Sequence, residues 1–287
     1  QGDAEGAITH ARRAIEVAAD DDHLSHGGAA SLIALAMWTT GDVRGAETAY
    51  AEGMARIAKA GYEADVVGGA VSAGDLLIAQ GRLRDAVLAY ERGLERATRG
   101  GGEPLRGAAD MHVGLAAVAY ERDDLELAAD HLRRSHQLGE ANGMPKHPCR
   151  WRLGEAALHA VRGDLEGALD MLDEAERRYD GDFSPDVRPV TAIRARMWIA
   201  HGRLREARTW AVERGLAPDD EQSYLREYEH ATLARLLVQE GRHDPARMDE
   251  AIGVIDRLIP QARAAGRMGA VIDLLAVRAT ARHLSGD

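Results

Sequence analysis

The sequence predicts an all-α protein, a right-handed superhelical solenoid of about seven helix-turn-helix units with about 14 antiparallel helices. Three observations support this prediction. One turn motif returns about every 40 residues along the 287-residue chain. Apolar residues make up 45% of the sequence but aromatic residues only 4%, a mixture that favours closely packed helices over a β-sandwich. No segment between the turns shows the alternating pattern of a strand.

The repeated turn has the pattern Gly-Asp/Arg-Leu-x-x-Ala. Successive turns start 39 to 45 residues apart, a regularity that indicates a repeat protein. The turns begin at Gly2, Gly41, Gly81, Asp123, Gly163, Gly202, Gly241 and Gly286.

Each position of the motif has a physical role. The glycine is expected to end the first helix of a unit, helix A, in a left-handed conformation, and the following Asp suits the N-cap of the second helix, helix B. A small residue seven positions before the turn and an Ala five positions after it allow helices A and B to approach closely. Large residues nine positions after the turn, such as Tyr50, Tyr90, Leu132 and Leu172, fill the space between units.

This arrangement resembles the tetratricopeptide repeat, whose usual period is about 34 residues. The longer period of about 40 residues here implies longer helices or longer connections. In the last unit, residues 246–250 form an insertion that is expected to delay helix B and to place Ala251 at the usual Ala position.

The repeat continues in step along the whole chain, which predicts one repeat domain over residues 1–287. The eight prolines are expected at helix ends or in loops, and residues 100–104 and 182–189 are predicted loops rather than domain boundaries. The chain opens on a helix B and closes on a helix A. This frame predicts a fragment of a longer protein.

Charge and composition exclude several classes of function. The net charge of -11 repels phosphate backbones, so we expect no contact with nucleic acid. Cys149 is the only cysteine, which rules out an internal disulfide framework and favours the cytoplasm. No apolar run approaches the roughly 20 residues of a membrane span, and the first residues do not form a signal peptide.

Several stretches resemble the superhelical repeat domain of MalT-type regulators, which are LuxR-family transcription factors with an N-terminal ATPase. The most specific stretch is residues 210–237, WAVERGLAPDDEQSYLREYEHATLARLL. Residues 120–132, YERDDLELAADHL, and residues 186–190, DVRPV, are also similar to that family.

The resemblance implies a sensor domain that binds a small-molecule inducer or a regulatory protein and takes part in self-association. In that family, ATP binding and a C-terminal helix-turn-helix lie in other domains. This chain contains no Gly-x-x-x-x-Gly-Lys-Ser/Thr phosphate loop and no basic recognition helix. We therefore expect ATPase and DNA-binding activity outside this chain, and no cofactor within it.

No pattern of residues predicts catalysis. His23 and His26 have a spacing that a transition metal uses, but a polar linker between helices is the favoured interpretation, and no metal is expected. Cys149 follows a His-Pro pair at a helix start, where packing is favoured over reactivity. The run from Arg226 to His230 is interpreted as ion pairs along a helix rather than an acid-base site. The chain is accordingly predicted not to be an enzyme.

The concave groove is the usual binding surface of a solenoid. By analogy with the tetratricopeptide repeat, positions three and six before each turn face this groove. A solvated inner face with no ligand is the alternative interpretation. The candidate ligand-binding residues at these positions are Trp38, Asp75, Tyr120, Arg196 and Arg235.

The leading hypothesis is a non-catalytic sensor or effector-binding domain of a bacterial MalT-type regulator. The alternative is a generic tetratricopeptide scaffold that binds a peptide or protein partner in its concave groove.

Overall fold

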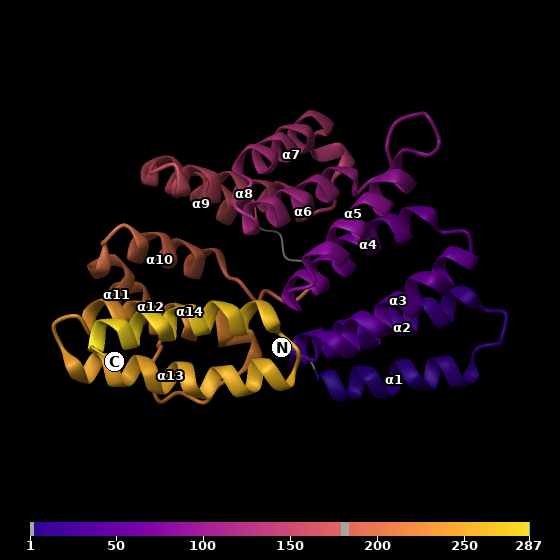
Figure 1. The fold of residues 1–287 in the computed structure, drawn as a ribbon. Helices are drawn as coiled ribbons and strands as arrows, with labels where there is room; N and C mark the ends of the chain where they lie inside the picture. Colours follow the sequence, from indigo (N-terminus) through magenta and orange to yellow (C-terminus); the bar gives the residue numbers. More distant parts are fainter. Residues whose placement is uncertain (1–2, 179–183, 287) are drawn as a thin grey trace. The chain divides into compact units, whose positions relative to one another are not determined.

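The computed structural model describes residues 3–178 and 184–286. These residues form 14 α-helices and two short 3-10 helices, and none of them forms a strand (Figure 1). The chain divides into two compact units, Gln1–Pro185 and Asp186–Asp287. The predicted all-α helical-repeat fold is confirmed. A single repeat domain over residues 1–287 stays a prediction.

Unit 1 is a series of helices in which each α-helix packs against the next. Helices α4, α6 and α8 are the A helices of their repeats and also contact one another, forming a layer that we call the A layer of unit 1. The helices of unit 1 are α1 (Ala4–Val17), α2 (His23–Thr40), α3 (Val43–Lys59), α4 (Glu63–Ala79), α5 (Leu83–Thr98), α6 (Ala108–Glu121), α7 (Leu125–Leu138), η1 (Glu140–Asn142), α8 (His147–Val161) and α9 (Leu165–Arg177).

Unit 2 repeats this plan. Helix α12 contacts both α10 and α14, and these three A helices form the A layer of unit 2. The helices of unit 2 are α10 (Val190–Ala200), α11 (Leu204–Glu213), η2 (Tyr224–Arg226), α12 (Glu227–Glu240), α13 (Pro245–Ala264) and α14 (Met268–Ser285).

The turn between α2 and α3 shows how the repeated motif works. Gly41 ends α2 with φ 89°, a conformation that a Cβ would strain, as predicted. Asp42 then caps α3, because its carboxylate accepts a hydrogen bond from the backbone N–H of Gly45 at 2.9 Å. Ala34 and Ala46, the two small positions of the motif, are both buried. Gly2, the first turn residue of the sequence, lies outside the described residues.

The last unit departs from the motif in two ways. Gly241 has φ -62°, so it is right-handed helical, and the predicted left-handed conformation is wrong at this turn. Helix α13 begins at Pro245 with Asp244 as its N-cap, so residues 246–250 belong to the helix rather than delaying it. The longer turn, residues 241–244, reverses the chain without a left-handed glycine. Ala251 is fully buried, as the motif predicts for its position.

Pro260 corrects a further expectation, because it lies inside α13 rather than at a helix end or in a loop. Proline has no N–H for the carbonyl of Asp256, four residues earlier. Both residues are on the exposed side of α13, where water can satisfy that carbonyl. The location therefore makes an interior proline tolerable.

Among the helices of the described residues, none has both the length and the apolar character needed to cross a membrane.

Tyr90 shows how a large residue fills the space between repeats. Its side chain is fully buried in the core of unit 1. The ring lies against glycines of two A helices: a Cβ at Gly74 of α4 would come within 2.2 Å of the ring, and one at Gly114 of α6 within 2.3 Å. The two glycines therefore make the room that the tyrosine occupies.

We predict that Gly114→Ala destabilises unit 1, because the new methyl group must displace a ring that has no free space around it. The expected loss is about 1–3 kcal/mol, typical of an overpacked core. Urea unfolding followed by circular dichroism measures it. Gly253→Ala on α13 is the control, because its Cβ would meet only the end of the Arg257 side chain at 3.6 Å. Equal stability of the Gly114 variant and the parent would contradict this packing.

Candidate functional site

The A layer of unit 1 contains a largely buried polar network centred on Arg150, in which Asp110 is fully buried and the side chains of Arg150 and Asp75 keep some exposure. Its guanidinium donates two hydrogen bonds to the carboxylate of Asp75, at 2.5 and 2.9 Å. Its Nε lies 3.6 Å from the carboxylate of Asp110. The phenol of Tyr90 donates to Asp75 at 2.7 Å. One arginine of α8 thus ties together side chains of α4, α5 and α6.

The electrostatics of this network are those of a closed ion-pair cluster. Burial alone would lower the pKa of Arg150, but the carboxylates of Asp75 and Asp110 raise it above its ordinary value. Burial, and then the Asp75 carboxylate, raise the pKa of the Tyr90 phenol well above its ordinary value. The cation stays charged and the phenol stays protonated, so the network holds the repeats together and offers no proton at neutral pH.

The A layer of unit 2 contains a different cluster, with an excess of positive charge. Arg196 of α10 donates to the hydroxyl of Thr232 at 2.9 Å and to one carboxylate oxygen of Asp273 at 3.1 Å. Arg235 of α12 donates to the other oxygen of Asp273 on α14. The Arg196 guanidinium also lies over the ring of Tyr228, 3.7 Å from its centre. Three successive A helices are joined here through one carboxylate.

The polar residues of the stretch 210–237 have a structural explanation. Glu229 is buried and pairs with Arg214 at 2.7 Å and with Arg226 at 3.2 Å. His230 is also buried, with Nε2 3.2 Å from the carboxylate of Asp220. These contacts fix the loop between α11 and α12 against the start of α12. The interpretation of residues 226–230 as structural ion pairs therefore agrees with the Arg226–Glu229 contact.

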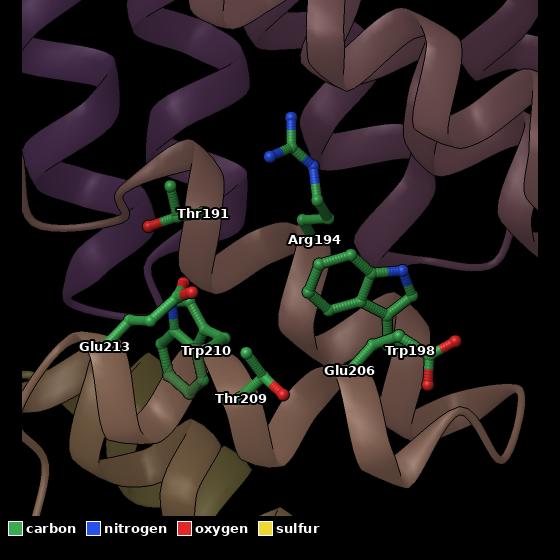
Figure 2. Close-up of a pocket in the computed structure, with 7 residues that line it drawn as sticks. All are labelled: Thr191, Arg194, Trp198, Glu206, Thr209, Trp210 and Glu213. Atoms are coloured by element: carbon green, nitrogen blue, oxygen red, sulfur yellow. The ribbon is translucent and has the colours of Figure 1, made fainter.

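A cavity of about 340 Å³ lies between α10 and α11 of unit 2 (Figure 2). Indole rings from both helices line it, Trp198 from α10 and Trp210 from α11. The Trp210 ring is buried, and its Nε1–H has no hydrogen-bond acceptor among the described residues. The volume lies at the lower end of the range for small-molecule pockets. The remaining lining residues are Thr191, Arg194, Glu206, Thr209 and Glu213.

The structure brings only some of the predicted groove residues together. Arg196 and Arg235 meet at Asp273, and Asp75 joins the Arg150 network. Tyr120 lies at the end of α6 and is 37% exposed. Trp38 lies near the end of α2 and is only 5% exposed, so packing hides most of the ring that we expected to offer a stacking surface.

The partners of these residues were not predicted from the sequence. A signal for them was present, because Asp110, Arg150, Tyr228 and Asp273 each lie thirteen positions before a turn. Positions six and thirteen before the turn differ by seven residues, or about two helical turns, and therefore share one side of helix A. The residues that line the cavity do not recur at fixed positions before each turn, so the repeat pattern gave no signal for them.

The histidines form no metal site among the described residues, in which no group of three or more His, Cys, Asp or Glu side chains could hold an ion. His26 contacts the carbonyl of Ala19 at 3.1 Å. In unit 1, the Nδ1 atoms of His112 and His131 lie 3.1 Å apart. His147 contacts the hydroxyl of Ser135 at 2.8 Å, where both residues are buried. That burial removes the pair from any substrate.

The stacked helix pairs and their polar A layers define a tetratricopeptide-like helical-repeat protein. The chain belongs to the MalT-like TPR region family, whose model matches residues 1–287. A comparison with the curated proteins gives no match. Among solved structures, the crystal structure of BtubC (BKLC) from P. vanneervenii is similar with a TM-score of 0.50 and 20% sequence identity, over 78% of this chain and 97% of that chain. This likeness concerns the fold alone.

We predict that Arg150→Met destabilises unit 1 by about 3 kcal/mol, because it leaves the carboxylates of Asp75 and Asp110 without their cation. Adding Asp75→Asn to this variant should recover part of the loss. Arg99→Met is the control, because Arg99 forms only an exposed ion pair with Glu95. Urea unfolding of the three variants tests the network. Equal losses for Arg150 and Arg99 would show that the buried pairs contribute nothing.

We also predict that the protein loses stability as the pH falls from about 6.5 to about 4. Burial, and then His131, lower the pKa of His112 to about 4. Burial, and then Arg150, lower the pKa of His147 to about 4. Unfolded histidine has a pKa of about 6.5, so between these values the unfolded chain binds protons that the folded chain does not. Stability therefore rises with pH across this window.

Thermal unfolding between pH 7.5 and pH 4.5 measures this dependence. The variant His112→Leu should show a shallower decrease in melting temperature than the parent. Its control, His243→Leu, changes an exposed histidine in the turn before α13 and should keep the parental pH dependence. Parallel curves for all three proteins would contradict the assignment.

Proposed function

We propose that this chain is the non-catalytic sensor region of a MalT-type, LuxR-family transcription regulator and that it binds an effector. The match to the MalT-like TPR region family over the whole chain supports the regulator class. The cavity between α10 and α11 is the observation that supports effector binding. We propose further that the chain works in the cytoplasm without a cofactor.

The chemistry of the cavity suits a small polar organic molecule. Trp198 and Trp210 offer flat apolar surfaces at little entropic cost, because an indole side chain has few rotatable bonds. The Nε1–H of Trp210 is buried without an acceptor among the described residues, and a ligand oxygen that reached it would supply the missing hydrogen bond. Glu206 and Glu213 are exposed carboxylates at the cavity and accept hydrogen bonds from ligand hydroxyl or amino groups.

Effector binding would influence the rest of a regulator through the contacts that α10 and α11 make with other helices. Helices α10 and α11 both pack against α12, which carries the buried Glu229 and His230. A ligand that orders α10 against α11 therefore acts on α12 directly. In this proposal the ATPase and DNA-binding functions belong to other domains, and self-association and a regulatory protein are the expected partners.

The alternative proposal is a generic tetratricopeptide scaffold that binds a peptide or protein partner in its groove. The charged residues Arg196 and Arg235 on the A layer of unit 2 favour it, because both side chains remain partly exposed. Capture of a partner that is lost in both Arg196→Ala and Arg235→Ala, without any small-molecule effect at the cavity, would support the scaffold over the sensor.

We predict that a thermal-shift screen with sugars, metabolites and short peptides finds a compound that raises the melting temperature by about 5 °C. A ligand at about 100 times its dissociation constant contributes about 2.7 kcal/mol of stability, enough for such a shift. Both Trp198→Ala and the exposed rim substitution Glu206→Gln should reduce the shift.

Trp151→Ala is the matched control, because Trp151 is a partly buried tryptophan of unit 1 whose Nε1 donates to the carbonyl of Leu132 at 3.0 Å. The control should keep the full ligand-induced shift even when its own melting temperature is lower. If no compound stabilises the parent, or if the Trp151 and Trp198 variants lose the shift equally, the cavity is not the effector site.

A further inference from the structure

We propose that the A layer of unit 2 binds a small anion carrying a phosphate or carboxylate group, at a cluster in which Arg196 and Arg235 bind Asp273 and Arg188 lies against the ring of Tyr228 that Arg196 also contacts. We call it the arginine cluster. It is distinct from the cavity between α10 and α11, because Arg196 faces α12 and α14 while the cavity residues of α10 face α11. This proposal does not rest on the proposed function.

The cluster has more positive than negative charge. Arg196 and Arg235 share the two oxygens of one carboxylate, that of Asp273. Arg188 lies over the ring of Tyr228, 5.6 Å from its centre, on the ring that Arg196 also contacts. Two guanidinium groups therefore bind one carboxylate, and a third, that of Arg188, lies against the aromatic ring that Arg196 also contacts.

The other acidic residues of the three A helices are already paired elsewhere. Glu227 binds Arg267 at 2.6 Å, where both side chains are about nine-tenths buried. Glu229 binds Arg214 and Arg226, and Glu240 binds Arg208. Helix α10 has no acidic residue, and Asp273 is the only one in α14. The three A helices thus supply one carboxylate, that of Asp273, to the two cations Arg196 and Arg235.

At least one N–H donor of the arginine cluster also remains without a hydrogen-bond acceptor among the described residues. A guanidinium has five N–H donors. The Nε of Arg235 is buried and has no acceptor among the described residues. Burial, together with the nearby cations Arg235 and Arg188, lowers the pKa of Arg196 despite the favourable Tyr228 and Asp273. An anion at this place would accept the unused bonds and offset the repulsion among the arginines.

The chemistry favours a small anion over an acidic macromolecule. Planar guanidinium groups bind phosphate and carboxylate oxygens in pairs, which gives both affinity and orientation. The chain as a whole carries a net charge of -11, which repels a polyanion approaching over a wide surface. A compact ligand touches only the arginine cluster and avoids that repulsion.

Isothermal titration calorimetry with inorganic phosphate and with citrate, at matched ionic strength, tests the proposal on the full chain. The two probes show whether the cluster prefers a phosphate or a carboxylate. Arg235→Gln and the exposed-site variant Arg188→Gln should weaken binding of the preferred probe about tenfold. Asp273→Asn removes the competing carboxylate and should strengthen binding several-fold.

Arg208→Gln is the matched control. Arg208 of α11 pairs with Glu240 of α12, the helix that carries Arg235, and its side chain is 32% exposed, against 31% for Arg235. Its loss changes the net charge equally but leaves the cluster intact, so binding should stay within about twofold of the parent. Circular dichroism confirms that each variant is folded. Because Trp198→Ala leaves the cluster intact, it should also leave anion binding unchanged, which separates this test from that of the effector cavity.

Three results would overturn the proposal. The first is the absence of measurable heat with either probe at millimolar concentration. The second is an equal loss of binding in the Arg208 and Arg235 variants, which would show that only the net charge of the chain matters. A weaker rather than stronger affinity in Asp273→Asn would likewise contradict a site in which Asp273 competes with the ligand.

Discussion

The two helices of each repeat approach each other at alanines and glycines, and this close contact sets the position of every other side chain. Ala34 and Ala46 are buried at that contact in one repeat, and Ala195 and Ala207 in another. Because the backbones are so near, there is no room to slide one helix along the other without a clash. The register of each helix pair is thereby fixed, and with it the direction of each polar residue.

This fixed register explains why charged residues of successive A helices meet. In unit 1 one arginine, Arg150, faces two carboxylates, those of Asp75 and Asp110. In unit 2 the same rows carry two arginines, Arg196 and Arg235, and a single carboxylate, that of Asp273, which leaves an excess of positive charge. One geometry therefore gives a closed structural network in one unit and a surface with spare donors in the other.

The fold could be predicted from the sequence because its signal is local and repeated. The spacing of the turns gives the helices, and Asp75, Arg196 and Arg235 were found from their distance to a turn. Their partners come from other repeats, at a row of positions that becomes visible only once the helices are seen to stack. The location of Pro260 inside α13 could not be predicted, because an interior proline is tolerated only where the helix faces solvent. The cavity could not be predicted either, because two tryptophans outside the repeat pattern, Trp198 and Trp210, line it.

Asp123 occupies the place of the turn glycine, and it is the one non-glycine residue with positive φ, 60°, among the described residues. That conformation costs an L-residue about 1–2 kcal/mol, although Asp tolerates it better than most. The repeat persists because Asp124 caps α7 and Ala128 is buried against its neighbour. A repeat of this fold can therefore form without the turn glycine, provided that the N-cap and the buried alanine are present. A search that counts repeats by the turn glycine alone would miss this unit, whereas one that counts the buried alanine would find it.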